Sequence, residues 1–174
     1  EKDCNYIARY DTATKNWTDL DGGADSVVYS IIKDGKGNLY VGGLFETIGG
    51  VQCNGIARWN ISSQQFSPMV TDTEYKIPVK SLAIDSNGNL YAGGSFTTIG
   101  GIPASRIAKW DSVAEKWSAL GDGVDAPIHS IAIDSKDNVY IGGSFKTAGG
   151  LASQYVAKWD SASGTWESLD GGLG

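Results

Sequence analysis

The stretch Ile107-Ala108-Lys109-Trp110-Asp111 decides the fold, because close copies of it recur along the whole chain. The copies are Ile7-Ala8-Arg9-Tyr10-Asp11, Ile56-Ala57-Arg58-Trp59-Asn60 and Val156-Ala157-Lys158-Trp159-Asp160. Their aromatic residues are separated by 49, 51 and 49 residues. A second aromatic follows in each copy, at Trp17, Phe66, Trp117 and Trp166. Three copies of a unit of about fifty residues, with half of a fourth, therefore fill the 174 residues.

Each unit contains four strand-like runs. In the last full unit these are residues 128–133, 139–145, 155–160 and 165–169, which are rich in β-branched and aromatic residues. Such composition, with apolar and polar residues alternating in the first run, is typical of strands. Short connections join neighbouring runs, so we expect each unit to form one antiparallel sheet. A period near fifty residues with four strands per copy is typical of a β-propeller, in which each sheet is a blade.

The predicted fold is therefore all-β, with about three and a half blades. We expect a half-blade at residues 5–20, holding only third and fourth strands, and full blades at 26–70, 77–120 and 127–170. Propellers usually need at least four blades to close a ring. Because the chain also begins with Glu1 rather than Met and shows no signal peptide, we expect it to be part of a longer propeller chain.

A homo-oligomer is the second interpretation of the incomplete ring. Two chains of three and a half blades add up to seven, which is a possible propeller. Both half-blades would, however, offer the same third and fourth strands, and neither chain has spare first and second strands to complete the other. Unpaired edges of this kind are interaction sites.

Composition and charge limit the partners. The formal net charge is −6 and the isoelectric point is about 4.6, which argues against nucleic acid, since a nucleic-acid partner needs a basic surface. Cationic residues do recur at one repeat position, and we interpret them as contacts within or between blades rather than a phosphate-binding ladder. They are Arg9, Arg58, Lys109 and Lys158. No apolar run is long enough to span a membrane.

The turn at residues 34–38 has a calcium-binding alternative, because Asp34 and Asn38 offer the oxygen ligands that a hard cation prefers. A bidentate Glu downstream is missing, so we favour an ordinary hairpin turn. No His, Cys and carboxylate cluster has zinc spacing, and we predict neither a metal nor a cofactor. The pair Gly42-Gly43 and its copies are expected to let another backbone or an aromatic ring approach a strand closely.

The two cysteines, Cys4 and Cys53, occupy the same repeat position on different blades. Packed sheets lie about 10 Å apart, whereas a disulfide needs Cα atoms within about 7 Å. We therefore expect no disulfide between them, and two thiols do not define the redox compartment.

With these residues in view, the unit resembles the kelch repeat. The features that carry the resemblance are a hydrophobic strand ending in Gly-Gly and an aromatic followed, after six residues, by Trp, as at Tyr10 and Trp17 or Trp110 and Trp117. The added Phe-x-Thr-x-x-Gly-Gly segment, as at residues 45–50, is similar to kelch-like propellers of secreted bacterial proteins and fungal cell-surface polarity markers. The resemblance covers the whole chain and implies fold more than function, because such propellers include enzymes, adhesins and scaffolds.

Positions that differ between copies are the candidates for function, because positions that stay the same are explained by the fold. In the first strand, the residue before the repeated serine is Tyr29, Lys80 or His129. The link before the second full blade is also longer, and it holds Tyr75 and Lys76. Propeller loops of these kinds emerge on one face near the central channel, so the five residues are predicted to line one binding surface. The alternative is that they are ordinary solvated loop and channel residues.

Catalysis has little support in the sequence. The chain has one histidine, His129, and no nucleophile with a matching sequence signature. A copper oxidase of the galactose-oxidase type is disfavoured, because that activity needs several imidazole and phenolate ligands. Asn16 and Asn60 begin Asn-x-Ser/Thr triplets and are possible N-glycosylation sites, which favours an extracellular or cell-surface protein.

The function predicted from these observations is a non-catalytic extracellular recognition or structural module that binds a protein or a glycan. One alternative is a carbohydrate-binding lectin, with Tyr75 and exposed Trp rings stacking on sugars. The other is a propeller enzyme that uses the channel residues Tyr29, Lys80 and His129.

Overall fold

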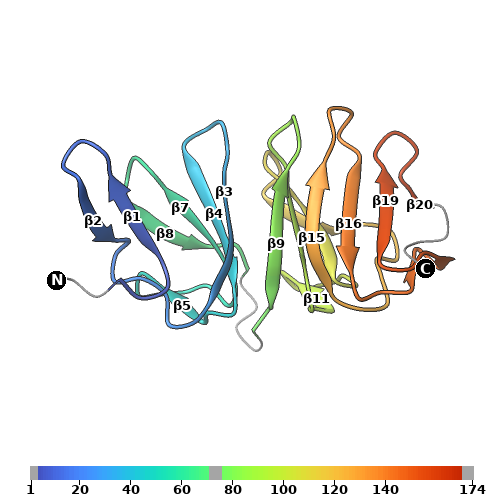
Figure 1. Ribbon diagram of the computed structural model, residues 1–174, viewed down its shortest axis with the longest axis horizontal. Coiled ribbons are helices and arrows are strands. Elements are labelled where there is room, and N and C mark those ends of the chain that lie inside the picture. Colours follow the sequence, from blue (N-terminus) through green and yellow to red (C-terminus); the bar gives the residue numbers. More distant parts are fainter. Residues whose placement is uncertain (1–3, 71–75, 170–174) are drawn as a thin grey trace.

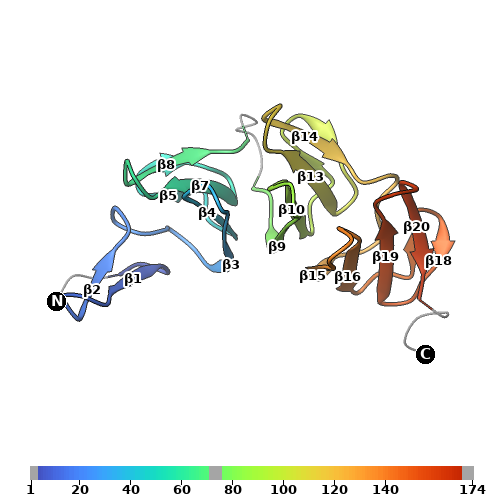
Figure 2. The ribbon, with the colours of Figure 1, turned by 90° about the horizontal axis from the view of Figure 1, so that it is seen from above.

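The computed structural model describes residues 4–70 and 76–169, and within these ranges every regular element is a strand. Antiparallel sheets stand side by side along the chain (Figure 1). Seen from above, they form an open arc, with β3, β9 and β15 on its concave side (Figure 2). The predicted all-β propeller fold is confirmed, because each full repeat forms one four-stranded antiparallel sheet in meander order.

The strands follow the repeat closely. The half-blade consists of β1 (Ala8–Asp11) and β2 (Asn16–Asp19). The first full blade consists of β3 (Val28–Lys33), β4 (Asn38–Gly43), β7 (Ile56–Asn60) and β8 (Gln65–Pro68). The second consists of β9 (Val79–Ile84), β10 (Leu90–Gly94), β13 (Ile107–Asp111) and β14 (Lys116–Ala119). The third consists of β15 (Ile128–Ile133), β16 (Val139–Gly143), β19 (Val156–Asp160) and β20 (Thr165–Ser168).

A small two-stranded hairpin interrupts each full blade between its second and third strands. The three hairpins are β5 (Thr47–Ile48) with β6 (Val51–Gln52), β11 (Thr98–Ile99) with β12 (Ile102–Pro103), and β17 (Thr147–Ala148) with β18 (Leu151–Ala152). The Phe-x-Thr-x-x-Gly-Gly segment was identified in the sequence, but no strands were predicted in it. In the first hairpin the turn is Gly49-Gly50, with φ of 58° and 71°, and glycine is the residue that adopts this left-handed region at least cost.

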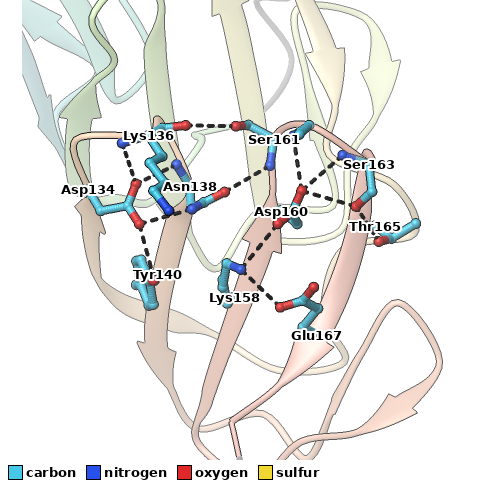
Figure 3. A network of polar contacts seen from close by, with 11 residues as sticks. Asp134, Lys136, Asn138, Tyr140, Lys158, Asp160, Ser161, Ser163, Thr165 and Glu167 are labelled. Atoms are coloured by element: carbon cyan, nitrogen blue, oxygen red, sulfur yellow. Dashed lines mark hydrogen bonds and ion pairs between the residues drawn. The ribbon is translucent and has the colours of Figure 1, made fainter.

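The hairpin turn between first and second strands is held by its own aspartate (Figure 3). The Asp134 carboxylate accepts hydrogen bonds from the amides of Lys136 and Asn138, from the Asn138 side chain at 2.9 Å and from the Tyr140 hydroxyl at 3.2 Å. The Asn138 hydrogen bonds are a leading cause that keeps the Asp134 pKa below its usual value. The carboxylate oxygens that suggested calcium thus accept hydrogen bonds from the turn and from a tyrosine of the second strand. Asp34 and Asp85 repeat the pattern.

Aromatic pairs lock the third strand to the fourth. Trp159 pairs with Trp166 across β19 and β20, with ring centroids 5.3 Å apart. The fourth-strand Trp also reaches the preceding blade, because Trp166 Nε1 donates to the Leu120 carbonyl at 3.0 Å and Trp117 Nε1 donates to the Met69 carbonyl at 2.8 Å. The repeated spacing of these aromatics therefore encodes packing both within and between blades.

The second-strand glycines make room for the next blade. A Cβ on Gly42 would lie 2.7 Å from Val79 Cγ1, and one on Gly93 would lie 2.8 Å from Ile128 Cγ2. A backbone or an aromatic ring was predicted beside the Gly-Gly pair, and this is confirmed at the second glycine, since a Cβ on Gly43 would meet the Val27 carbonyl and the Phe45 ring. It is wrong at the first glycine, Gly42 or Gly93. Aliphatic side chains from the first strand of the following blade fill the space above both glycines, because blades stack face to face through their inner strands.

At each end of the arc, one face that resembles an inter-blade interface is exposed. Ile31, which matches the buried Leu82 and Ile131, has 51% of its surface exposed. At the other end, a Cβ on Gly142 would have no side chain within 4 Å. Trp17 of the half-blade is 66% exposed, compared with 6% for Trp166. The end blades thus present apolar surface that the middle blade buries.

The expected absence of a disulfide between Cys4 and Cys53 holds in the structure. Cys53 is fully buried in the core of the first blade, and this burial raises the pKa of its thiol to about 12. Among the described residues, no helix is long and apolar enough to cross a membrane.

Candidate functional site

The first strands of the three full blades lie next to one another on the concave side of the arc (Figure 2). The repeated serine ties each of these strands to the next blade. Ser30 Oγ accepts a hydrogen bond from the Leu82 amide at 3.2 Å, and Ser81 Oγ accepts one from the Ile131 amide at 3.0 Å. The residue before each serine varies between copies.

A β-bulge places the three variable residues Tyr29, Lys80 and His129 in equivalent positions. In β15, Ile128 pairs with Gly143 and Ser130 with Gly142, so His129 is left without a partner in the ladder. The same shift leaves Lys80 unpaired in β9 and Tyr29 unpaired in β3. Bulges redirect a side chain and are frequent beside functional sites. We call Tyr29, Lys80 and His129 the bulge row.

Two members of the bulge row are in direct contact. Lys80 Nζ lies 3.3 Å from His129 Nδ1, and His129 Nε2 lies 2.9 Å from Ser144 Oγ. An ammonium group only donates hydrogen bonds, so Nδ1 must accept. The neutral ring then carries its proton on Nε2 and donates it to Ser144, a tautomer assigned here from the partners. Tyr29 is 47% exposed, so its ring and hydroxyl are accessible to a ligand.

Lys76, another of the predicted residues, does not join this contact. Lys76 lies just before β9, and its Nζ pairs with a Glu46 carboxylate oxygen at 2.9 Å, with both side chains largely exposed. Tyr75 lies outside the described residues. The structure therefore brings Lys80 and His129 together and leaves Lys76 at a separate place.

Ser144 contacts His129 of the bulge row, and it was not predicted from the sequence. It follows the Gly142-Gly143 pair in the third blade, where the other blades have Leu44 and Ser95. The variable residue after each Gly-Gly pair was the only signal available. The position of Ser144 beside His129 depends on the bulge, which pairs Gly143 with Ile128.

The hydrogen-bond pattern around His129 is the reverse of the one that activates a serine. In a catalytic triad, a carboxylate accepts from Nδ1–H, so that Nε2 is free to take the serine proton. Here Lys80 donates to Nδ1, and Nε2 already holds a proton. The arrangement offers a cation, hydroxyl groups and an exposed aromatic ring to a ligand, which are groups suited to binding by hydrogen bonds and stacking.

Three of the recurring cationic residues of the third strand, Arg58, Lys109 and Lys158, contact carboxylates. Lys158 Nζ lies 3.2 Å from Asp160 and 3.0 Å from Glu167 (Figure 3), and Arg58 pairs with Glu115 of the next blade at 2.8 Å. Lys109 Nζ lies 3.5 Å from the buried carboxylate of Asp85. These partners support the interpretation as contacts within and between blades.

Both predicted glycosylation residues are exposed, Asn16 at the start of β2 and Asn60 at the end of β7. The Asn60 side-chain oxygen accepts hydrogen bonds from the amides of Ser62 and Ser63, at 3.0 and 2.9 Å. Their modification remains a prediction.

Comparison with known proteins agrees with the propeller fold. The profile of the Rax2 C-terminal beta propeller domain matches residues 68–173. This chain belongs to that family. A second profile, of the beta-propeller domain of unknown function DUF5122, matches residues 34–60 of this Rax2-type propeller. No curated protein matches its sequence.

Solved structures share the fold of the Rax2-type propeller at low sequence identity. The extracellular domain of the one component system BT4673 from B. thetaiotaomicron has 16% identity and a TM-score of 0.63 over 95% of this chain. The extracellular domain of the hybrid two component system BT3049 from the same organism has 16% identity and a TM-score of 0.60. This chain spans about a fifth of the length of each structure, at 20% and 19%.

Proposed function

We propose that this chain is a non-catalytic recognition or structural module that presents its loop face to a protein or glycan partner. We further propose an extracellular or cell-surface location and a kelch-like repeat. The location is supported by the exposed Asn16 and Asn60 triplets and by the fold shared with extracellular domains of bacterial sensor systems. The paired aromatics, such as Trp110 and Trp117 with centroids 5.3 Å apart, support the kelch-like repeat.

The single observation that carries the binding role is the bulge row. Three side chains of different chemistry, Tyr29, Lys80 and His129, occupy one repeated backbone position, while the serine after each of them is kept. The fold accounts for the repeated bulge, but it does not require a different side chain at the exposed bulge position in each blade, so this variation supports a binding role.

The hydrogen bonds of His129 favour binding over catalysis. With Lys80 donating to Nδ1, the ring is not set to accept a proton from Ser144. The enzyme alternative makes a distinct prediction, which is hydrolase activity that is lost in His129→Ala and kept in Lys36→Ala, a change of an exposed residue in a distant turn.

The protein and glycan alternatives are separated by a two-arm screen. The chain is tested against a glycan array and against a displayed random-peptide library, with Tyr29→Ala and Tyr75→Ala variants run in parallel. Saturable glycan binding that both Tyr variants lose supports the lectin alternative. Peptide binding without glycan binding supports a protein partner, and no binding in either arm would contradict a recognition role.

We also propose that the open ends of the arc pack against further blades of the same kind, from a longer propeller chain or, second, from other copies. The two interfaces inside the chain are the template, since each fits aliphatic side chains of one blade over a glycine of the preceding one. Light scattering on the isolated chain tests this proposal. A soluble, well-behaved monomer would contradict both forms, and a stable dimer would contradict the longer chain.

A further inference from the structure

Two blades use an aspartate to hold the start of the small hairpin. The Asp25 carboxylate accepts hydrogen bonds from the amides of Glu46 and Thr47, at 2.9 and 3.0 Å, and from the Thr47 hydroxyl at 3.0 Å. In the third blade Asp125 accepts from the amides of Lys146 and Thr147, at 2.8 and 3.0 Å. Two consecutive amides pointing at one carboxylate make a site for an anion, because each N–H is a directed donor.

The aspartate is bound in its charged form. Partial burial raises the pKa of Asp25, but hydrogen bonds from the amides of Thr47 and Glu46 outweigh this effect, so the net pKa lies below its usual value. Burial also raises the pKa of Asp125, and hydrogen bonds from the amides of Thr147 and Lys146 outweigh it, so the net pKa is again lowered. The donor pair thus favours a carboxylate over a carboxylic acid.

The second blade has the donors without the aspartate. Lys76 stands three residues before Val79, as Asp25 stands three before Val28 and Asp125 three before Ile128. The matching amides belong to Thr97 and Thr98, which follow Phe96. Among the described residues, which leave out residues 71–75 directly before Lys76, neither amide donates a hydrogen bond to a side-chain oxygen.

A pocket lies where the carboxylate would be. It has a volume of about 520 Å³ and is lined by Lys76, Ile77, Pro78, Thr97 and Thr98, among others. Its lining thus combines a cationic residue, Lys76, and two threonines with apolar residues. Lys76 also pairs with Glu46, but both side chains are largely exposed, so this ion pair is weak and can exchange for another carboxylate.

We infer that this pocket binds a carboxylate side chain of an acidic peptide, received by the amides of Thr97 and Thr98 and by the Lys76 ammonium. An aspartate on a polypeptide is the favoured occupant, because that is what fills the equivalent place in the other two blades. The inference deepens the proposed function, on which it rests for the source of the carboxylate. The pocket lies at the same end of the second blade as Lys80, only a few residues from β9.

The test is a titration of the ¹⁵N-labelled chain with N-acetyl-aspartate amide, with N-acetyl-asparagine amide as the neutral control. Saturable shifts of the Thr97 and Thr98 amide resonances are expected with the aspartate derivative, with a Kd on the order of 1 mM. The asparagine derivative should leave these two resonances unchanged. Equal shifts with both compounds, or none with either, would overturn the inference.

Variants locate the site. Lys76→Asp restores the aspartate of the other blades, so it should abolish the titration and raise the melting temperature. Lys36→Asp makes the same change in charge at an exposed turn and should keep the titration. Asp25→Ala should create a second responsive pair, at the amides of Glu46 and Thr47. Unchanged binding in Lys76→Asp would contradict the site.

A third arm tests the source of the carboxylate. Glucuronate carries the same group on a sugar, and tighter binding of glucuronate than of the aspartate derivative would contradict a peptide occupant. These readouts are amide resonances of the second blade, whereas the proposed function is tested through the bulge row. Failure of the carboxylate titration would therefore not contradict binding through the bulge row, and failure of bulge-row binding would not contradict the titration.

Discussion

Lys80 Nζ lies 3.3 Å from Nδ1 of His129, so a side chain of the second blade sets the hydrogen-bonding state of a side chain in the third. Because the ammonium can only donate, it selects the tautomer with the proton on Nε2, where Ser144 accepts it. This part of the bulge row is therefore formed by a contact between two neighbouring blades.

The tautomer of His129 is directly measurable, because the chain has a single histidine. Long-range ¹H–¹⁵N spectra of the neutral ring should show the proton on Nε2. In Lys80→Met the donor to Nδ1 is gone, and the population of the Nδ1–H form should rise. A neutral ring that carries its proton on Nδ1 in the unchanged chain would contradict the assigned arrangement.

The serine ties between blades should contribute to stability. Ser81→Ala removes the acceptor for the Ile131 amide and should lower the free energy of unfolding by about 1 kcal/mol, as should Ser30→Ala. Ser130→Ala is the matched control, because Ser130 has the same repeat position but is exposed at the open end. Denaturant titrations measure all three, and an equal loss in Ser130→Ala would contradict the inter-blade role.

The glycines of the second strand should differ in their tolerance of a methyl group. In Gly93→Ala the new Cβ would lie 2.8 Å from Ile128 Cγ2, and overpacking of this kind costs about 1–3 kcal/mol. Gly42→Ala should behave alike. Gly142→Ala is the control, because its Cβ would meet no side chain at the open end. Thermal unfolding compares them, and equal destabilisation would show that a further blade covers Gly142.

The stability of the third blade should fall in acid through Asp160. Hydrogen bonds from the Ser163 amide, and then the Lys158 side chain, lower the pKa of Asp160 to about 2. Because the folded pKa lies below the unfolded value of about 3.9, the unfolded chain binds the proton first. The stabilisation is therefore present above about pH 4 and lost as the pH falls through about 2.

Asp160→Asn should make this fall less steep and should keep the turn, since Asn60 already caps the equivalent turn in the first blade. Asp122→Asn, at an exposed position, serves as the control for the change in net charge. Urea unfolding at several pH values checks the difference in slope. An identical pH dependence in Asp160→Asn and the unchanged chain would contradict the assignment.

The repeats made the sheets predictable, because strand alternation and the pairing of Trp110 with Trp117 are local and recur at a fixed spacing. The small hairpins were not predicted, since two-residue strands such as β5 carry almost no alternation. Ser144 and the pocket before β9 were missed for a different reason. Their meaning comes from a bulge and from contacts between segments far apart in the sequence, which a single repeat does not encode.

The central claim is that the bulge row forms a recognition surface, and one binding comparison tests it most directly. A peptide or glycan selected from the libraries is titrated against two triple variants. The first is Tyr29→Ala with Lys80→Ala and His129→Ala. The second is Lys36→Ala with Asn87→Ala and Lys136→Ala, at exposed turns on the opposite ends of the same strands.

Loss of the bulge row should weaken binding at least ~10-fold, since a few central side chains carry most of the affinity of an interface. The turn variant should bind as the unchanged chain does. Circular dichroism and melting temperature establish that both triple variants are folded before the comparison is made. Full affinity in the folded bulge-row variant would contradict the account.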